Sequence, residues 1–186
     1  MKQLQQAPEL VVSQWFNADK TITLEALRGR VIVMEAFQML CPGCVSHGLP
    51  QAQQIAALFP SDKVSVIGLH TVFEHHAAMT PVSLEAFIHE YRLSFPIGVD
   101  EAGPGGMPRT MAAYGLRGTP SLVIIDQNGI LRANHFGQVH DLQVGAEIAT
   151  LLAERATAEL NTPEDAGEEQ ICDENGCPLP ASGVNS

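Results

Sequence analysis

The most constraining feature of this sequence is the stretch from residue 31 to 59, where a buried strand leads into two cysteines and a helix. Val31–Phe37 is an almost continuous apolar run, which is typical of a strand covered on both faces. Cys41-Pro42-Gly43-Cys44 follows four residues later. Beyond it, apolar residues recur at spacings of three and four, as on one face of a helix: Val45, Leu49, Ala52, Ala56 and Phe59. The stretch predicts a helix-covered sheet with two thiols at a helix start.

Strand and helix patterns continue to alternate along the chain. Apolar runs predict strands over 64–69, 95–99, 121–125 and 130–136, and helical spacings predict helices over 83–91, 107–114 and 141–152. Strands joined by helices require right-handed crossovers and a parallel core, whereas Asn128-Gly129 predicts a late antiparallel hairpin. The expected fold class is α/β, a three-layer sandwich whose central mixed sheet has helices on both faces. A further short hairpin is expected around Trp15-Phe16 and Ile22-Thr23-Leu24.

Charge divides the chain into a body and a tail. The 186 residues carry 21 acidic and 10 basic side chains, a formal net charge of −11. Six of the acidic residues and none of the basic ones follow residue 160. We therefore expect one domain over residues 1–160 and a flexible acidic tail over 161–186. The acidic balance argues against nucleic-acid binding and against docking on an anionic membrane.

The sequence start bears on the compartment in which the cysteines would work. Residues 1–8 contain no apolar segment of the kind found in signal peptides, and no run approaches 18 apolar residues. We expect a cytoplasmic protein that does not cross a membrane. In that compartment a close cysteine pair is more often catalytic or metal-binding than a structural disulfide.

The position of Cys41 and Cys44 indicates thiol chemistry. A helix start offers unpaired backbone N–H groups and a partial positive charge, and both favour the thiolate that attacks disulfides. Cys41 at the helix tip is the expected nucleophile. Cys44, further in, would resolve the mixed disulfide by attacking Cys41. Pro42 suits the first turn, where a missing N–H costs nothing.

Together with a second motif, the cysteine pair carries a family resemblance. Val31–Phe37, the Cys41–Cys44 motif and Gly118-Thr119-Pro120 before the strand 121–125 make the sequence resemble the thioredoxin superfamily, within it the TlpA/ResA-like thiol-disulfide oxidoreductases of the redoxin group. The resemblance covers roughly residues 8–155 and includes the longer insertion around 70–95. It implies a thioredoxin-like fold and does not extend to the tail.

The resemblance also implies roles for residues outside the cysteine pair. Thr119-Pro120 would be a cis peptide bond beside the two sulfurs and would present backbone to an extended substrate. Glu35, six residues before Cys41, would be a buried carboxylate that helps move protons at the resolving cysteine. Two features depart from the common pattern: the dipeptide Pro42-Gly43, and Pro50, which falls one residue later than in typical relatives.

Other cysteines and histidines leave alternatives open. Cys172 and Cys177 in the tail form either a second redox pair, able to exchange with Cys41, or two inert thiols. His70, His75 and His76 lie near the end of the second predicted strand and form either a metal site with Glu74 or a set of solvated side chains. His47 either tunes the thiols or lies on the helix surface.

Three functions remain in competition. The main prediction is a thiol-disulfide oxidoreductase that acts on a protein or small-molecule disulfide, is served by a partner reductase and needs no bound cofactor or metal. A redoxin-type thiol peroxidase would show Pro-x-x-x-Thr-x-x-Cys, but Met34 and Gln38 occupy those positions before Cys41. A metal-binding protein or metal chaperone is the third, because Met39-Leu40-Cys41-Pro42-Gly43-Cys44 matches the Met-x-Cys-x-x-Cys pattern of small copper carriers. A zinc site made from both cysteine pairs is formally possible.

Overall fold

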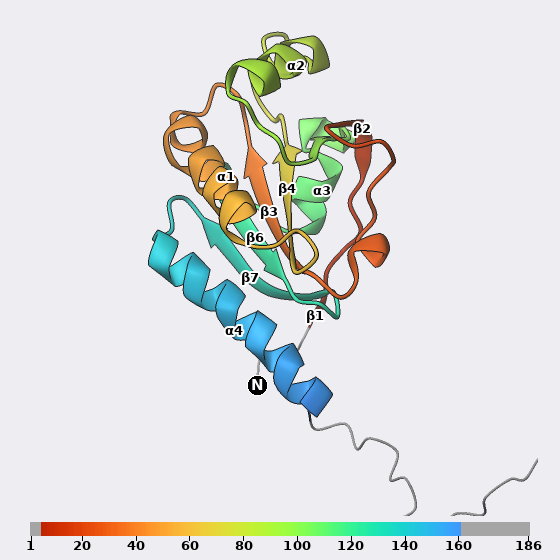
Figure 1. The fold of residues 1–186 in the computed structure, drawn as a ribbon. Coiled ribbons are helices and arrows are strands. Elements are labelled where there is room, and N and C mark those ends of the chain that lie inside the picture. The colour runs from red at the N-terminus through yellow and green to blue at the C-terminus, as the bar shows by residue number, and fades with distance from the viewer. Residues whose placement is uncertain (1–4, 161–186) are drawn as a thin grey trace, which may run out of the picture.

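One mixed β-sheet of seven strands organises the molecule (Figure 1). The computed structural model describes residues 5–160, with side-chain environments up to residue 154. Within this range the strands lie in the order β1-β7-β6-β3-β4-β5-β2. Their bounds are β1 Gln5–Gln6, β2 Val12–Phe16, β3 Val31–Phe37, β4 Val64–His70, β5 Ile97–Asp100, β6 Ser121–Ile125 and β7 Ile130–Phe136.

The helices are short apart from the last. They are α1 Leu49–Leu58, α2 Pro81–Glu90, α3 Arg109–Ala113 and α4 Asp141–Leu160, with single turns η1 Glu25–Leu27, η2 Cys44–Gly48 and η3 Pro104–Gly106. Among the described residues, no helix is long and apolar enough to cross a membrane.

Strand β3 lies at the centre of the sheet and combines both pairing modes. It pairs in parallel with β4, and β4 with β5, through the crossovers predicted from sequence. On its other side β3 pairs antiparallel with β6, which forms the expected hairpin with β7. The mixed sheet of an α/β fold is therefore confirmed.

Two apolar layers enclose the sheet. Alternate residues of β3 point to opposite faces: Val31, Val33 and Phe37 pack with α1, α2 and α4, whereas Ile32, Met34 and Ala36 pack with Met111 of α3 and with the N-terminal segment. Glu35 shares its face with the first set. Helices on both faces confirm the three-layer arrangement.

The N-terminal lead-in differs from the expected hairpin. Val12–Phe16 is a strand, but its partner is β5, so that β2 forms one edge of the sheet. Ile22-Thr23-Leu24 is not a strand; Leu24 is buried and precedes the turn η1. Both segments are only partly buried. Their apolar residues predict contact with the core, but not which distant strand each segment meets.

Candidate active site

The candidate active site lies where β3 ends. After Phe37 the chain turns, with the Cys41 N–H donating to the Gln38 carbonyl, and the first helical bond follows from Val45 N–H to the Cys41 carbonyl. Cys41 therefore stands at the start of the helical segment. Buried β3 fixes one side of this junction and α1, packed on the same sheet face, fixes the other.

The two thiols occupy different environments. Cys41 is half-buried, whereas Cys44 is completely buried, and both are free thiols. The Cys44 backbone N–H donates to Cys41 Sγ at 3.3 Å. Such a bond stabilises negative charge on the Cys41 sulfur, as expected of an attacking thiolate. Burial raises the pKa of the Cys44 thiol well above its usual range, and a hydrogen bond with Cys41 adds to the shift. Cys44 therefore needs a base before it can attack.

The segment before β6 closes one side of the site. The Thr119–Pro120 peptide bond is cis, as the resemblance implies, and the Cys41 thiol donates to the Thr119 carbonyl at 3.4 Å. Pro120 also approaches the helix start, because a Cβ on Gly43 would lie 3.1 Å from its Cδ. Thr119, Pro120 and Cys41, far apart in sequence, thus meet at one surface.

Glu35 lies beneath this surface. Its side chain is 1% exposed, and burial, with a contribution from Cys41, raises its pKa well above the usual value. Among the described residues, its Oε1 has no hydrogen-bond partner. Glu35 forms part of the wall of a cleft of about 140 Å³ that also involves His47, Gly48, Pro120 and Asp141. A carboxylate in this position can accept a proton at near-neutral pH.

A widened helical turn brings Gly48 against Glu35. Residues Cys44–Gly48 form a π-helical turn before α1. Pro50 has no N–H to give to the Ser46 carbonyl, and its ring would clash there in a regular helix, so the wider turn accommodates it. At Gly48 a Cβ would overlap the Glu35 carboxyl group and lie 3.1 Å from Pro120 Cβ. Only glycine leaves room for the carboxyl group.

A second hollow adjoins the other side of Cys41. It encloses about 180 Å³ between Leu40, Cys41, Glu74, His75 and Met79. Leu40 is 57% exposed, although it is a large apolar residue directly before the nucleophile. The exposed sulfur therefore has open space beside it that is partly lined by apolar atoms.

The histidines predicted to cluster near β4 do not act together. His70 is buried, and burial lowers its pKa to about 4, whereas His75 and His76 are exposed in the loop. Among the described residues, no group of three or more potential ligands could hold a metal ion. His47 is exposed on the helix surface, 2.6 Å from Ser46 Oγ through its Nδ1. Cys172 and Cys177 lie outside the described residues.

Sequence reasoning missed two residues of the site. Gly48 gave no signal beyond a glycine in a helical pattern, because its significance depends on the carboxyl group that it faces. Gln38 follows β3, is 2% exposed, and accepts from Phe73 N–H through its side chain at 3.4 Å. Its backbone carbonyl also receives the Cys41 N–H. Gln38 thereby ties the cysteine turn to the loop after β4.

A buried central strand leads into a C-x-x-C pair, and a cis proline lies beside that pair. Together with the mixed sheet, these features define a thioredoxin-like protein. A comparison with known protein families identifies the family: residues 4–134 of this chain match the AhpC/TSA family. The chain belongs to the AhpC/TSA family.

Curated relatives are similar at lower identity. The thiol-disulfide oxidoreductase ResA of Halalkalibacterium halodurans is 24% identical over 125 residues, which is 67% of this chain and 64% of ResA. Protein DipZ of Mycobacterium tuberculosis is 27% identical over 135 residues, 71% of this chain but 18% of DipZ. The chain therefore spans less than two thirds of the length of these relatives.

Two solved structures are more similar. A crystal structure of a thioredoxin-like superfamily protein is 68% identical, with a TM-score of 0.78, covering 79% of this chain and 96% of that one. A thiol-disulfide isomerase from Corynebacterium glutamicum is 46% identical, with a TM-score of 0.78, covering 82% of this chain and 99% of the other. In both comparisons the match covers nearly the whole length of the solved chain.

Proposed function

We propose that this protein is a thiol-disulfide oxidoreductase that uses Cys41 as nucleophile and Cys44 as resolving thiol. The observation that carries the proposal is the pairing of a half-exposed sulfur, which receives a backbone N–H, with a fully buried one three residues later. The names of ResA and of the isomerase from Corynebacterium glutamicum support the same chemistry.

The reaction proceeds by two sulfur exchanges. The Cys41 thiolate attacks one sulfur of a substrate disulfide; a Cys41–substrate bond forms, the substrate bond breaks, and the first substrate thiolate takes up a proton. Glu35 then accepts the Cys44 proton, and the Cys44 thiolate attacks Cys41 Sγ. A Cys41–Cys44 disulfide forms, and the second substrate thiolate leaves and takes up the proton released by Glu35. The substrate gains two electrons and two protons; the protein gives up the two electrons, the Cys44 proton and the proton that Cys41 lost when it ionised.

Glu35 suits this role because its environment raises the pKa of its carboxyl group, so that its carboxylate readily takes up a proton. The carboxyl group is buried, and the nearby Cys41 sulfur raises its pKa further. Once the Cys41 sulfur enters a disulfide its charge is gone, so the carboxylate becomes easier to maintain at that stage. The cleft between His47, Gly48 and Pro120 opens toward the carboxyl group and offers the proton a way out.

The site favours this function over the two alternatives. The peroxidase motif is absent before Cys41, where Met34 and Gln38 stand, and both of these side chains are buried. Neither side chain carries a hydroxyl group that could donate to a peroxide at the sulfur. A metal carrier would expose both thiolates to one ion, whereas Cys44 is sealed in the apolar core.

The substrate class follows from the surface around Cys41. A protein or small-molecule disulfide can approach between the Thr119-Pro120 backbone and the hollow beside Leu40. A partner reductase is needed to return the Cys41–Cys44 disulfide to the dithiol. A cytoplasmic location stays a prediction.

Insulin reduction driven by dithiothreitol tests the proposal. We expect the wild-type protein to accelerate it and Cys41→Ser to lack all acceleration. Cys44→Ser is expected to accumulate mixed disulfides with insulin through Cys41, visible on non-reducing gels, because the resolving attack is lost. Equal activity of wild-type and Cys41→Ser proteins would contradict the proposal.

A further inference from the structure

The carboxyl group of Glu35 exchanges a proton in the reaction above, yet it lies away from the solvent. Its side chain is 1% exposed, and a buried group passes a proton on only to an acceptor within hydrogen-bond reach or through water. The cleft of about 140 Å³ provides that access. We propose that His47, on the wall of this cleft, carries the proton between Glu35 and the solvent. The proposal rests on the proposed function for one point, Glu35 as the proton acceptor of Cys44.

The cleft reaches a buried oxygen atom that lacks a partner. Within the part of the chain whose side chains are described, Glu35 Oε1 has no hydrogen-bond partner. A Cβ on Gly48 would overlap this atom, so the missing side chain leaves Oε1 open toward the cleft that both residues line. About 140 Å³ leaves room for several water molecules. Water bound to Oε1 can then move a proton along the cleft.

His47 is the basic group on the wall of this cleft. Among the described residues that line it, three have titratable side chains: Glu35, His47 and Asp141. Asp141 Oδ1 already accepts from Gln51 Nε2 at 2.7 Å, which holds its carboxylate against α1. Histidine is the side chain that ordinarily gains and loses a proton near neutral pH. His47 is therefore better suited than Asp141 to pass protons on to the solvent.

Neighbouring hydrogen bonds determine which nitrogen of His47 can accept. Ser46 Oγ lies 2.7 Å from the Pro42 carbonyl and 2.6 Å from His47 Nδ1. Because a carbonyl only accepts, the single hydroxyl proton of Ser46 is donated to Pro42, and Ser46 Oγ accepts from Nδ1–H. The lone pair of neutral His47 is then on Nε2. Since His47 is exposed, Nε2 can take up a proton from cleft water and release it outside.

The transfer needs no reactant other than water. Glu35 accepts the Cys44 proton and passes it through cleft water to His47 Nε2, and His47 returns to its neutral form by giving a proton to the solvent. The departing substrate thiolate takes up one proton from the same solvent. Electrons move only between the sulfurs, so the balance of the reaction above is unchanged. When the disulfide is reduced again, the same steps run in reverse and return a proton to Cys44.

Single-turnover kinetics of the full chain test the inference. Every protein carries Cys172→Ser and Cys177→Ser, so that a chromogenic disulfide meets only the two thiols of the site. The first phase reports the attack by the nucleophile, and the second reports the resolving attack. At low buffer concentration, His47→Gln should slow the second phase and leave the first unchanged. The loss should be smaller than the about 10²-fold expected for Glu35→Gln, because water still reaches the carboxyl group.

Imidazole in solution supplies a readout that a merely structural role of His47 would not move. Free imidazole can carry protons to and from the cleft in place of the missing ring. The second phase of His47→Gln should therefore rise with imidazole concentration toward the wild-type rate, whereas the wild-type rate should not respond. When Glu35→Gln is also present, His47 has no proton to carry. The double variant should thus be no slower than Glu35→Gln alone and should not respond to imidazole.

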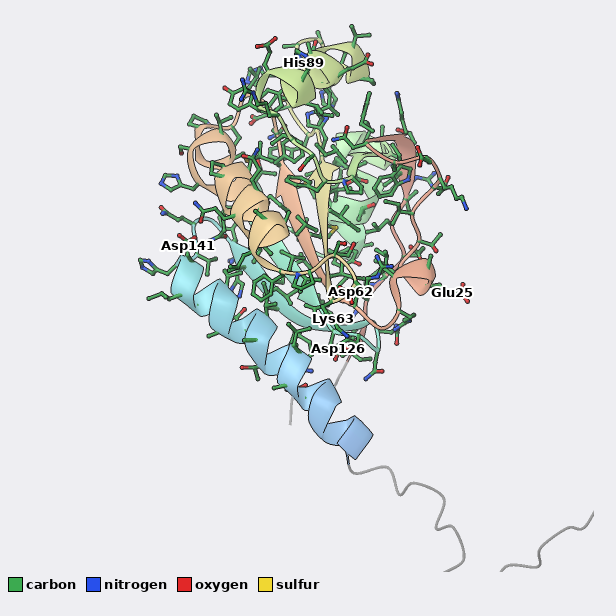
Figure 2. The ribbon with its side chains drawn as sticks, in the orientation of Figure 1. Glu25, Asp62, Lys63, His89, Asp126 and Asp141 are labelled. Atoms are coloured by element: carbon green, nitrogen blue, oxygen red, sulfur yellow. The ribbon has the colours of Figure 1, made fainter. Side chains whose placement is uncertain are left out.

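His89→Gln is the matched control. His89 is an exposed histidine of α2 beside Glu90. Figure 2 shows it away from Asp141, which lies at the end of α4 nearer to α1 and lines the cleft. The substitution removes the same ring from a surface position that has no access to Glu35. Both phases should keep their wild-type rates, with and without imidazole.

Three outcomes would overturn the inference: a second phase of His47→Gln at the wild-type rate, a loss that imidazole does not restore, or a further loss when His47→Gln is added to Glu35→Gln. A loss restored by imidazole in Asp141→Asn, with His47→Gln unaffected, would assign the transfer to Asp141 instead. Insulin reduction by the wild-type protein is measured in parallel. If insulin is reduced but one of these outcomes is found, the inference about His47 fails alone. If insulin is not reduced, the proposed function fails.

Discussion

Gly48 faces the carboxyl group of Glu35 with no side chain between them. A Cβ at residue 48 would overlap Glu35 Oε1 and would lie 3.1 Å from Pro120 Cβ. One glycine in a widened helical turn thus connects the buried acid to the cis-proline segment. Space for a carboxyl group, rather than backbone freedom, explains this glycine.

Gly48→Ala should therefore impair both folding and reaction. Forcing a methyl group into a filled site costs about 1–3 kcal/mol, which exceeds the gain in helix propensity. We expect a lower urea midpoint and slower resolution of mixed disulfides, because Glu35 is displaced. Gly145→Ala is the matched control, since nothing lies within 4 Å of that position in α4. It should stabilise the protein by about 0.5–1 kcal/mol. Equal effects of the two substitutions would contradict the packing explanation.

Glu35→Gln should slow the resolving step while leaving the first attack by Cys41 nearly unchanged. Glutamine keeps the volume but cannot accept the Cys44 proton at neutral pH. Stopped-flow measurement with a chromogenic disulfide separates the two phases. The second phase should lose about 10²-fold or more in rate. If both phases slow by the same factor, Glu35 affects the site as a whole and is not the proton acceptor.

Glu35 should also shape the pH dependence of stability. Its folded pKa is raised by burial, so the folded state holds a proton that the unfolded chain has already lost. The contribution of Glu35 to the free energy of unfolding is therefore greatest below the unfolded pKa of about 4.3 and falls as pH rises toward the folded value. Urea titrations of the wild type and Glu35→Gln at several pH values should show this decline as a difference between the two proteins that changes with pH. A difference that stays constant with pH would contradict the burial of a titrating carboxyl group.

His70 should act in the opposite direction. Its folded pKa is lowered from 6.5 to about 4 by burial beside Phe37. The unfolded chain therefore binds a proton that the folded protein refuses, and stability is lost as pH falls from 6.5 to about 4. His70→Leu should remove this acid-dependent loss. The difference between wild-type and variant unfolding curves, measured between those pH values, checks the prediction, and a difference that does not change with pH would refute it.

Asp100 should be important for the stability of the contact between β5 and α3. Its carboxylate accepts from the backbone N–H groups of Thr110 and Met111 and from Thr71 Oγ1, at 2.8, 2.9 and 3.0 Å. It therefore holds the first turn of α3 against β5. Asp100→Ala leaves those donors buried and unpaired, at a cost of about 3 kcal/mol. Asp62→Ala, an exposed control, should change stability by less than about 0.5 kcal/mol. Chemical denaturation of both variants measures these changes in the free energy of unfolding, and equal changes would contradict the prediction.

Much of the central fold could be predicted because its signals are local. The apolar run of β3 and the Asn128-Gly129 turn each depend on neighbouring residues only, and both appear where expected. The exposed apolar residues show the limits of such patterns. Tyr91 continues the apolar spacing of the helix predicted over 83–91, yet it is 46% exposed, and its ring stacks on Phe87 with 4.2 Å between the ring centroids. Helical spacing marks an apolar stripe but not how far the core extends beneath it.

The sequence by itself determined the chemistry of this protein: two sulfurs at a helix start, an acid inside an apolar strand, and a proline opening β6. Each follows from residue type and local spacing. Only the tertiary structure decided that Gly48 frames Glu35 and that β2 pairs with β5. These relationships join residues distant in sequence, and long-range packing is fixed by the whole core rather than by any one segment.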